Sequence, residues 1–221
     1  MSEQFRLRIV YAKQDRLRWL SHLEVMRAME RLVRRSGLPY VVTQGFNRHM
    51  RFAIGPALPV GTAGLNELFD VWLTQYVAPS DAQTALSQAA DDIIAIRKVQ
   101  YVNPDAKGLQ ATHTINRYLL LVDSAVGALE LQSAMDAVIA TGHLELPHKK
   151  STRSFDLSQT VAESPVVLPT VDADGYLLVS CAIVSSDTGS LRPEQLLACA
   201  LDEGSRIVSV TRTALESPDT V

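Results

Sequence analysis

Residues 21–39 carry the signals for both ends of one helix, and this helix constrains the N-terminal half more than any other feature. Ser21 precedes Glu24 by three residues, the spacing of a capping box, in which each side chain accepts a hydrogen bond from the other residue's backbone amide. Gly37 suits the left-handed conformation that often ends a helix, and Pro39 prevents continuation. Apolar residues at helical spacing between these signals predict one amphipathic helix. They are Leu23, Val25, Met26, Met29, Leu32 and Val33.

Arginines follow the same helix at intervals of three and four residues, which places them in a stripe beside the apolar face. They are Arg27, Arg31, Arg34 and Arg35. The last two lie in the final turn, where the helix dipole favours cations. The stripe is either a solvated helix face or a contact surface for an anionic partner.

After the helix, residues 40–43 predict a short strand and residues 44–51 predict a loop of mixed chemistry. The loop contains Gln44, Phe46, Asn47, Arg48, His49 and Arg51. Arginine can contact a phosphate through two hydrogen bonds, phenylalanine can stack on a base, and amides can read base edges. The alternative is a structural loop whose Phe46 fills the core and whose amides cap backbone groups.

Charge is unevenly distributed along the chain. Residues 1–51 contain 11 Lys and Arg against 4 Asp and Glu, whereas the remainder contains 10 against 20. This asymmetry is typical of a protein with a local anionic partner, although the net charge of the whole chain is only −3. There is no apolar signal-peptide segment, and no stretch approaches the roughly 18 apolar residues of a membrane helix. We therefore expect a cytoplasmic protein without a membrane partner.

Cysteine and histidine indicate neither a cofactor nor a metal site. Cys181 and Cys199 are isolated in apolar surroundings, which predicts buried, reduced thiols. The five histidines lack zinc-ligand spacing with cysteine, and the chain has no cluster-binding cysteine triad. We expect no catalytic residue. One alternative stays open, in which His22 or His49 is the general acid or base of a metal-independent ribonuclease.

Strand and helix signals run in the order β-α-β-β-α-β, twice. In the first half the strands are expected at 5–13, 40–43, 68–76 and 93–102, and the second helix at 82–90. In the second half the elements are expected at 115–123, 128–140, 176–184, 193–201 and 207–213, with the second strand not located. Residues 103–114 have the composition of a linker.

This order predicts an α+β protein of two ferredoxin-like units packed in tandem. The basic N-terminal unit is expected over residues 1–104 and the C-terminal unit over residues 113–215. Residues 216–221 are expected to be a disordered tail. Within the C-terminal unit, Arg192, Arg212 and Asp156 are expected to form a structural ion-pair cluster.

Several motifs combine in this chain. They are Ser21-His22-Leu23-Glu24, Arg34-Arg35-Ser36-Gly37-Leu38-Pro39, Gln44-Gly45-Phe46-Asn47-Arg48-His49, Gly55-Pro56-Ala57-Leu58-Pro59-Val60-Gly61, Arg153-Ser154-Phe155-Asp156-Leu157, Arg192-Pro193 and Thr211-Arg212-Thr213. Together they resemble the radical SAM-linked domain family of unknown function, in its stand-alone form. The family usually has Asp in place of Glu24 and prolines in place of Arg48 and Met50. The resemblance implies association with a radical SAM protein and with RNA processing or translation, without implying a reaction.

Three functions follow as hypotheses. The first is an RNA-binding or accessory module that acts through the basic N-terminal half. The second is a protein-docking partner of a radical SAM enzyme, and the third is the ribonuclease described above. The candidate binding residues are Ser21, His22, Arg27, Arg31, Arg34, Arg35, Gln44, Phe46, Asn47, His49, Arg51 and Arg153. Lys149 and Lys150 would extend the surface around Arg153.

Overall fold

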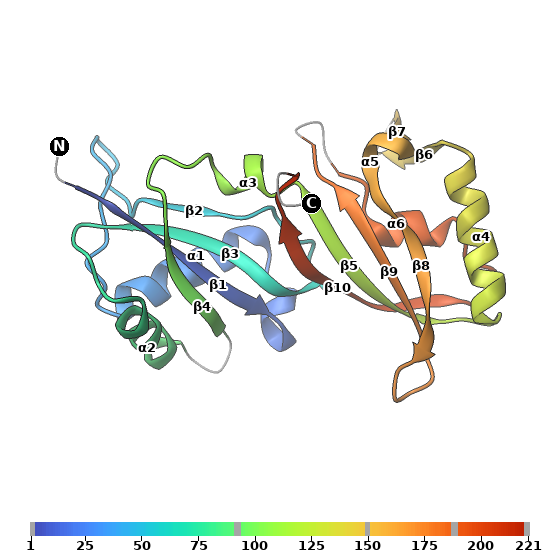
Figure 1. The fold of residues 1–221 in the computed structure, drawn as a ribbon, viewed down its shortest axis with the longest axis horizontal. Coiled ribbons are helices and arrows are strands. Elements are labelled where there is room, and N and C mark those ends of the chain that lie inside the picture. The colour runs from blue at the N-terminus through green and yellow to red at the C-terminus, as the bar shows by residue number, and fades with distance from the viewer. Residues whose placement is uncertain (1–2, 91–93, 149–150, 187–189, 219–221) are drawn as a thin grey trace. The chain divides into compact units, whose positions relative to one another are not determined.

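The computed structural model describes residues 3–90, 94–148, 151–186 and 190–218. The chain divides into two compact units, residues 1–113 (unit 1) and 114–221 (unit 2). Both combine antiparallel strands with a few helices, so the predicted α+β class is confirmed (Figure 1). No helix in the described part of the chain is long and apolar enough to cross a membrane.

Unit 1 is built on a four-stranded antiparallel sheet of order β4-β1-β3-β2. Its elements are β1 (Phe5–Lys13), the 3-10 helix η1 (Asp15–Trp19), α1 (His22–Arg35), β2 (Phe52–Ile54), β3 (Ala63–Leu73), α2 (Pro79–Ala89), β4 (Ala95–Val102) and α3 (Leu109–Thr112). Side chains alternate between the two faces of a strand. The apolar set of β1 and β3 therefore faces α1 and α2, and this side holds the core.

The capped helix forms as predicted. Ser21 Oγ accepts a hydrogen bond from the Glu24 amide, and the Glu24 carboxylate accepts one from the Ser21 amide at 2.8 Å. Gly37 has a φ of +72°, a conformation that lacks a steric penalty only without a Cβ atom. The apolar face is narrower than predicted, because Leu23 is 60% exposed.

The second strand of unit 1 lies later than predicted. Residues 40–43 contribute only two isolated bridges, Tyr40 with Leu73 and Val42 with Met50. The strand itself is β2, which pairs with Phe69–Val71 of β3 in a segment rich in Pro and Gly. Three residues are too few to show the alternation by which a strand is recognised.

Unit 2 has a sheet of order β10-β5-β9-β8, again with antiparallel neighbours, and a separate β6-β7 hairpin. Its elements are β5 (Ile115–Asp123), α4 (Ala128–Ala140), β6 (His143–His148), β7 (Ser151–Asp156), α5 (Leu157–Thr160), β8 (Val161–Val171), β9 (Leu177–Val184), α6 (Pro193–Ala198) and β10 (Arg206–Glu216). Apolar residues of α4 and α6 pack against β5 and β9 to form its core.

Two predictions for unit 2 are wrong in part. The disordered tail was expected to start at residue 216, but β10 continues to Glu216, which pairs with Ile115. Residues 219–221 lie outside the described residues. Cys181 is buried as expected, and burial raises the pKa of its thiol to about 12. Cys199, in contrast, is exposed just after α6.

Candidate functional site

The loop expected at residues 44–51 is held at its base by backbone contacts. The Thr43 amide donates to the His49 carbonyl at 2.8 Å, and the Arg51 amide donates to the Val41 carbonyl at 2.7 Å. The His49 amide also donates to Thr43 Oγ1 at 3.2 Å. These hydrogen bonds join the two ends of the loop and hold its tip in a defined position.

Phe46 is fully exposed at this tip, so the alternative in which it fills the core is wrong. Gln44, Asn47, Arg48 and His49 around it are exposed as well. His49 Nδ1 lies 3.1 Å from the Asn47 carbonyl, which fixes the ring by local contacts. An exposed aromatic ring among amide and cationic groups is a surface that can stack on a planar ligand.

Arg51 connects the loop to the sheet. Its guanidinium lies 4.6 Å from the ring centre of Trp72 on β3, and it also donates to Gln4 Oε1. The guanidinium of Arg6, the cross-strand partner of Trp72 on β1, lies 4.8 Å from the same ring. Two cations thus contact one buried indole, a favourable cation–π arrangement.

Asp70 joins this row of side chains on the face of the sheet opposite α1 and α2. Its carboxylate is fully buried and accepts from Arg6 Nε at 2.8 Å and from Arg8 Nε at 2.9 Å. Arg6 is 1% exposed and Arg8 is 13% exposed. Two guanidinium partners compensate the buried carboxylate, and its hydrogen bonds order both of them.

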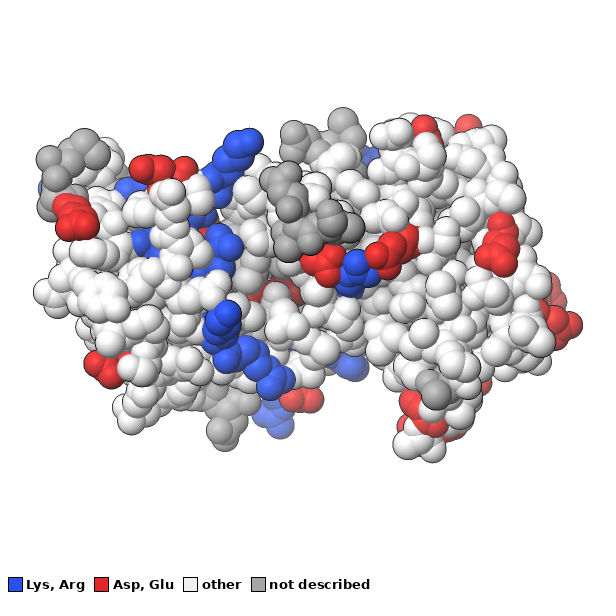
Figure 2. Space-filling view, in the orientation of Figure 1, with Lys and Arg blue, Asp and Glu red and all other residues white. Residues whose placement is uncertain are grey.

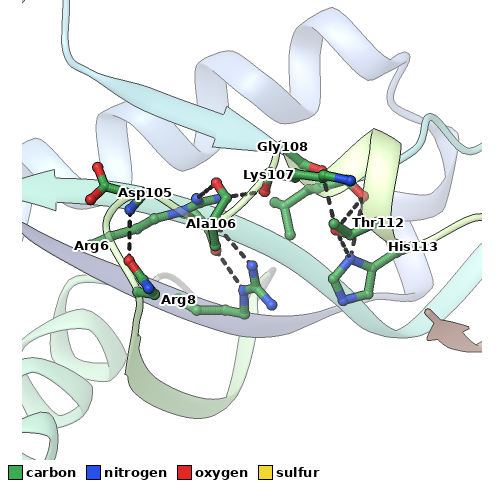
Figure 3. Close-up of polar contacts among 11 residues, drawn as sticks. Arg6, Arg8, Asp105, Ala106, Lys107, Gly108, Thr112 and His113 are labelled. Carbon is green, nitrogen blue, oxygen red and sulfur yellow. Dashed lines mark hydrogen bonds and ion pairs between the residues drawn. The ribbon is translucent and has the colours of Figure 1, made fainter. Parts of the chain in front are cut away.

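The predicted linker folds over this buried cluster. Arg6 donates to the carbonyl of Ala106 at 2.5 Å and to that of Lys107 at 3.3 Å, as Figure 3 shows. The segment, which includes α3, therefore covers the sheet face opposite α1 and α2 rather than leaving it open for bases. Lys107 on the segment and Lys98 on β4 are exposed, and Figure 2 shows Lys and Arg gathered on this face of unit 1.

His113 ends the same segment. Burial, together with the nearby Arg8 and Arg6 guanidinium groups, lowers its pKa. Its Nδ1 lies 2.8 Å from Thr112 Oγ1 and 3.3 Å from the Leu109 carbonyl (Figure 3). The carbonyl can only accept, so Nδ1 carries a proton, and the lowered pKa favours the neutral ring over the imidazolium.

The arginine stripe of α1 is exposed but partly neutralised. Arg34 forms an ion pair with Glu30 at 2.6 Å, and Arg35 donates to the Ala89 carbonyl at the end of α2. Glu24 lies at the start of the same exposed face and interacts with Arg27. The stripe is thus a mixed surface, and it lies on the helical side of the sheet, away from Asp70.

His22 and His49 do not share a site. His22 lines a narrow pocket with Tyr11, Lys13 and Glu67, the last of which lies on β3. The loop that carries His49 starts beside Trp72, near the end of β3. Trp72 lies five residues beyond Glu67, which is about 17 Å at 3.4 Å per residue. Ser21 lies next to His22 and acts as the helix cap.

In unit 2, Arg153 lies on β7 with its guanidinium 5.6 Å from the ring centre of Phe155. The predicted cluster of Arg192, Arg212 and Asp156 is wrong. Asp156 caps α5 by accepting from the Ser158 amide, and Arg212 donates to Asn116. Lys149 and Lys150 lie outside the described residues.

Sequence reasoning missed Arg6, Arg8, Asp70 and Trp72. The signal was present, since Arg6 and Arg8 alternate with apolar residues on β1, as Asp70 and Trp72 do on β3. What could not be inferred is the register that places Arg8 opposite Asp70.

Comparisons with known proteins give a family but no activity. Residues 6–193 match the model of a family described as "Uncharacterized protein conserved in bacteria (DUF2344)". No curated protein matches the sequence.

Three solved structures to which the chain is similar share the fold at low identity. They are a chain of an H/ACA RNP bound to a substrate RNA containing 2′-deoxyuridine (TM-score 0.45, 13% identity), one of a Cbf5-Nop10-Gar1 complex (0.48, 13%) and one of the archaeal box H/ACA sRNP Nop10-Cbf5 complex (0.44, 12%). Each match covers 91% of this chain and less than half, 46–47%, of the other. Matches of this size say nothing about what the present chain binds.

Proposed function

The chain belongs to the family of uncharacterized bacterial proteins DUF2344, and because that description names no activity, we propose from the site alone that unit 1 binds single-stranded RNA. Phe46 would stack on a base, and the cations on either side of it would contact the phosphates. The observation that carries this proposal is the full exposure of Phe46 at the tip of a loop whose two ends are joined by backbone hydrogen bonds.

The exposed Phe46 ring offers a flat apolar face at the tip of an ordered loop. Base stacking on an aromatic side chain tolerates any sequence, because every base has a flat face. Arg48 lies two residues from Phe46, and Asn47 and Gln44 add hydrogen-bonding groups beside the ring. These residue types together are those that single-stranded RNA sites use.

The phosphate path would run from the loop onto the segment that covers the sheet face opposite α1 and α2. Arg51 contacts Trp72, Trp72 contacts Arg6, and Arg6 reaches the Lys107 carbonyl, so these groups form one row of contacts. Exposed Arg48, Arg51 and Lys107 would then contact successive phosphates. The α1 stripe is a weaker candidate for this role, because Glu24 and Glu30 lie among its arginines.

The finer parts of the sequence prediction belong to the same proposal. We propose that each unit is a ferredoxin-like fold, which the strand orders β4-β1-β3-β2 and β10-β5-β9-β8 support. A radical SAM protein as the partner that delivers or uses the RNA rests on the sequence resemblance alone. If the protein is purified from a native host and no radical SAM protein is recovered with it, the proposed partner is ruled out, whereas the proposal of RNA binding is unaffected.

The test is RNA binding by the full chain at two salt concentrations, with single-stranded and duplex RNA compared by fluorescence anisotropy. Loss of one stacked base in Phe46→Ala should cost about 1–3 kcal/mol, which is about 5- to 150-fold in Kd. Leu129→Ala is the matched control, because Leu129 is also strongly exposed but lies in unit 2.

Equal binding by wild type, Phe46→Ala and Leu129→Ala would rule out the stacking site. Absence of binding at low salt would instead point to a protein as the partner of this loop. Cleavage of the RNA that is lost in His49→Ala would revive the ribonuclease hypothesis.

A further inference from the structure

Unit 2 contains a pocket of about 330 Å³ between the β6-β7 hairpin and the start of α6. Its lining residues are Leu146, Pro147, Arg153, Phe155, Ser190, Arg192 and Gln195. They come from three segments that are separated in sequence but meet in one unit. Two of them carry Arg153, a candidate binding residue from its sequence motif, and Arg192, which was expected in an ion-pair cluster that the structure does not form.

The hairpin provides one cation and the apolar floor. Arg153 and Phe155 are two residues apart on β7, so their side chains leave the same face of the hairpin. Leu146 is the cross-strand partner of Arg153 on β6 and lines the same pocket. Phe155 is buried and Arg153 half-buried, and the Arg153 guanidinium lies 5.6 Å from the ring centre of Phe155.

The opposite wall provides the second cation. Arg192 directly precedes α6, is exposed, and has no ion-pair partner among the described residues. The Arg192 amide donates to Gln195 Oε1 at 3.3 Å, which orients the Gln195 amide group. With Oε1 engaged in this way, the Nε2 donors of Gln195 remain for another acceptor.

None of the described residues lining this pocket is acidic. Its polar side chains carry two guanidinium groups, an amide and a hydroxyl, and polar atoms form most of its lining; Leu146, Pro147 and Phe155 add a smaller apolar part. Guanidinium groups bind carboxylate and phosphate oxygens with paired, charge-assisted hydrogen bonds. We propose that this pocket binds a small organic anion, whose carboxylate or phosphate lies between Arg153 and Arg192 and whose apolar body lies on Phe155 and Leu146.

The size of the pocket restricts the ligand further. Pockets for small molecules commonly span about 300–1,000 Å³, so this one is at the lower end of the range. A single ring with one anionic group fits such a volume, whereas an RNA strand does not enter it. The site is therefore separate from the RNA surface proposed for unit 1, and either can be correct without the other.

The test is calorimetric titration of the full chain with four probes: phenyl phosphate, benzoate, inorganic phosphate and the neutral benzyl alcohol. Phenyl phosphate or benzoate should bind, and the stronger of the two identifies the head group. Inorganic phosphate and benzyl alcohol should bind much more weakly, because each lacks one half of the ligand.

Arg192→Gln or Arg153→Gln should raise the Kd of the preferred probe about 10- to 150-fold, the usual range for losing a hydrogen bond to a charged group. Arg192→Lys keeps the charge and should recover part of the binding. Arg206→Gln is the matched control, since Arg206 lies in unit 2 but pairs with Asp123 at the surface.

The proposal is overturned if none of the four probes binds at millimolar concentration in low salt. It is also overturned if the preferred probe binds equally to the wild type, Arg192→Gln and the control. Unchanged circular dichroism of Arg192→Gln, a residue at the exposed pocket wall, excludes misfolding as the reason for a loss.

Discussion

Replacing Asp70 by Asn should destabilise unit 1 far more than replacing any of its surface carboxylates. Asp70 is completely buried and accepts hydrogen bonds from Arg6 and from Arg8 at 2.8–3.0 Å. Asparagine keeps the shape but removes the charge, so the Arg6 guanidinium, itself 1% exposed, would remain buried without a counter-ion. The amide group also adds donors that face the donors of both arginines.

The magnitude follows from the burial. Removing one partner of a buried ion pair costs about 3–5 kcal/mol, mostly because the remaining charge is uncompensated. Native domains are stable by only about 5–15 kcal/mol. With a urea m-value of about 1–3 kcal/mol per molar, the midpoint of unfolding should fall by about 1 M or more.

Tryptophan fluorescence makes this measurement specific to unit 1. The chain has two tryptophans, Trp19 and Trp72, and both lie in unit 1. Trp72 also contacts Arg6, so its emission reports directly on the cluster. Urea unfolding followed by this signal therefore measures the unit that contains Asp70.

Glu30→Gln is the matched control. Glu30 forms an exposed i, i+4 ion pair with Arg34 on α1, and such pairs contribute about 0.3–0.5 kcal/mol. Should Asp70→Asn shift the midpoint no more than Glu30→Gln, the buried cluster does not stabilise unit 1 and the reasoning fails. Faster proteolysis within residues 103–112 should accompany the loss, because Arg6 also holds that segment.

Two further predictions rest on single groups. Burial and Arg8 lower the pKa of His113, so below about pH 6.5 the unfolded chain binds more protons than the folded one, and the free energy of unfolding should fall as the pH drops from 7 to 5. His113→Gln should make this dependence of the unfolding free energy on pH shallower, as urea titrations at several pH values would show. An unchanged dependence would contradict the prediction. Burial raises the pKa of Cys181 to about 12, so its reactive thiolate is scarce and shielded. Iodoacetamide should therefore modify the exposed Cys199 in the native protein and Cys181 only after unfolding, as peptide mass mapping would show. Modification of Cys181 in the native protein would contradict its burial.

Local signals predicted the capped helix and most strands well. The capping box of Ser21 and Glu24 and the φ of Gly37 depend only on residues next to one another, so sequence spacing was sufficient. β2 was missed because a three-residue strand is defined by its partner β3 rather than by its own pattern. β8 was missed for a similar reason, since its pairing with β9 is interrupted by several irregularities.

The loop of the candidate site was predicted, but the cluster on the sheet beside it was not. The exposed loop with Phe46 and His49 lies where the sequence indicated it. The sequence could not show that Arg51 contacts Trp72, because that contact requires the fold of β3 beside the loop. The pairing of Arg153 with Arg192 across one pocket needed the β6-β7 hairpin, whose position relative to α6 depends on packing.

The number of Lys and Arg residues in the N-terminal part of the chain overstates how many cations its surface offers to RNA. The number that contact RNA can be measured from the salt dependence of binding. Among the 11 cations before residue 52, Arg6 and Lys13 are 1% and 2% exposed, and Arg8 is held by Asp70. Each phosphate contact contributes about 0.7 to the slope of log K against log salt for a single strand. If Arg48, Arg51 and Lys107 alone contact RNA, the slope should be about −2, whereas the excess of positive charge in residues 1–51 would give about −5. A steep slope would mean that the α1 arginines contact RNA after all, whatever the result with Phe46→Ala.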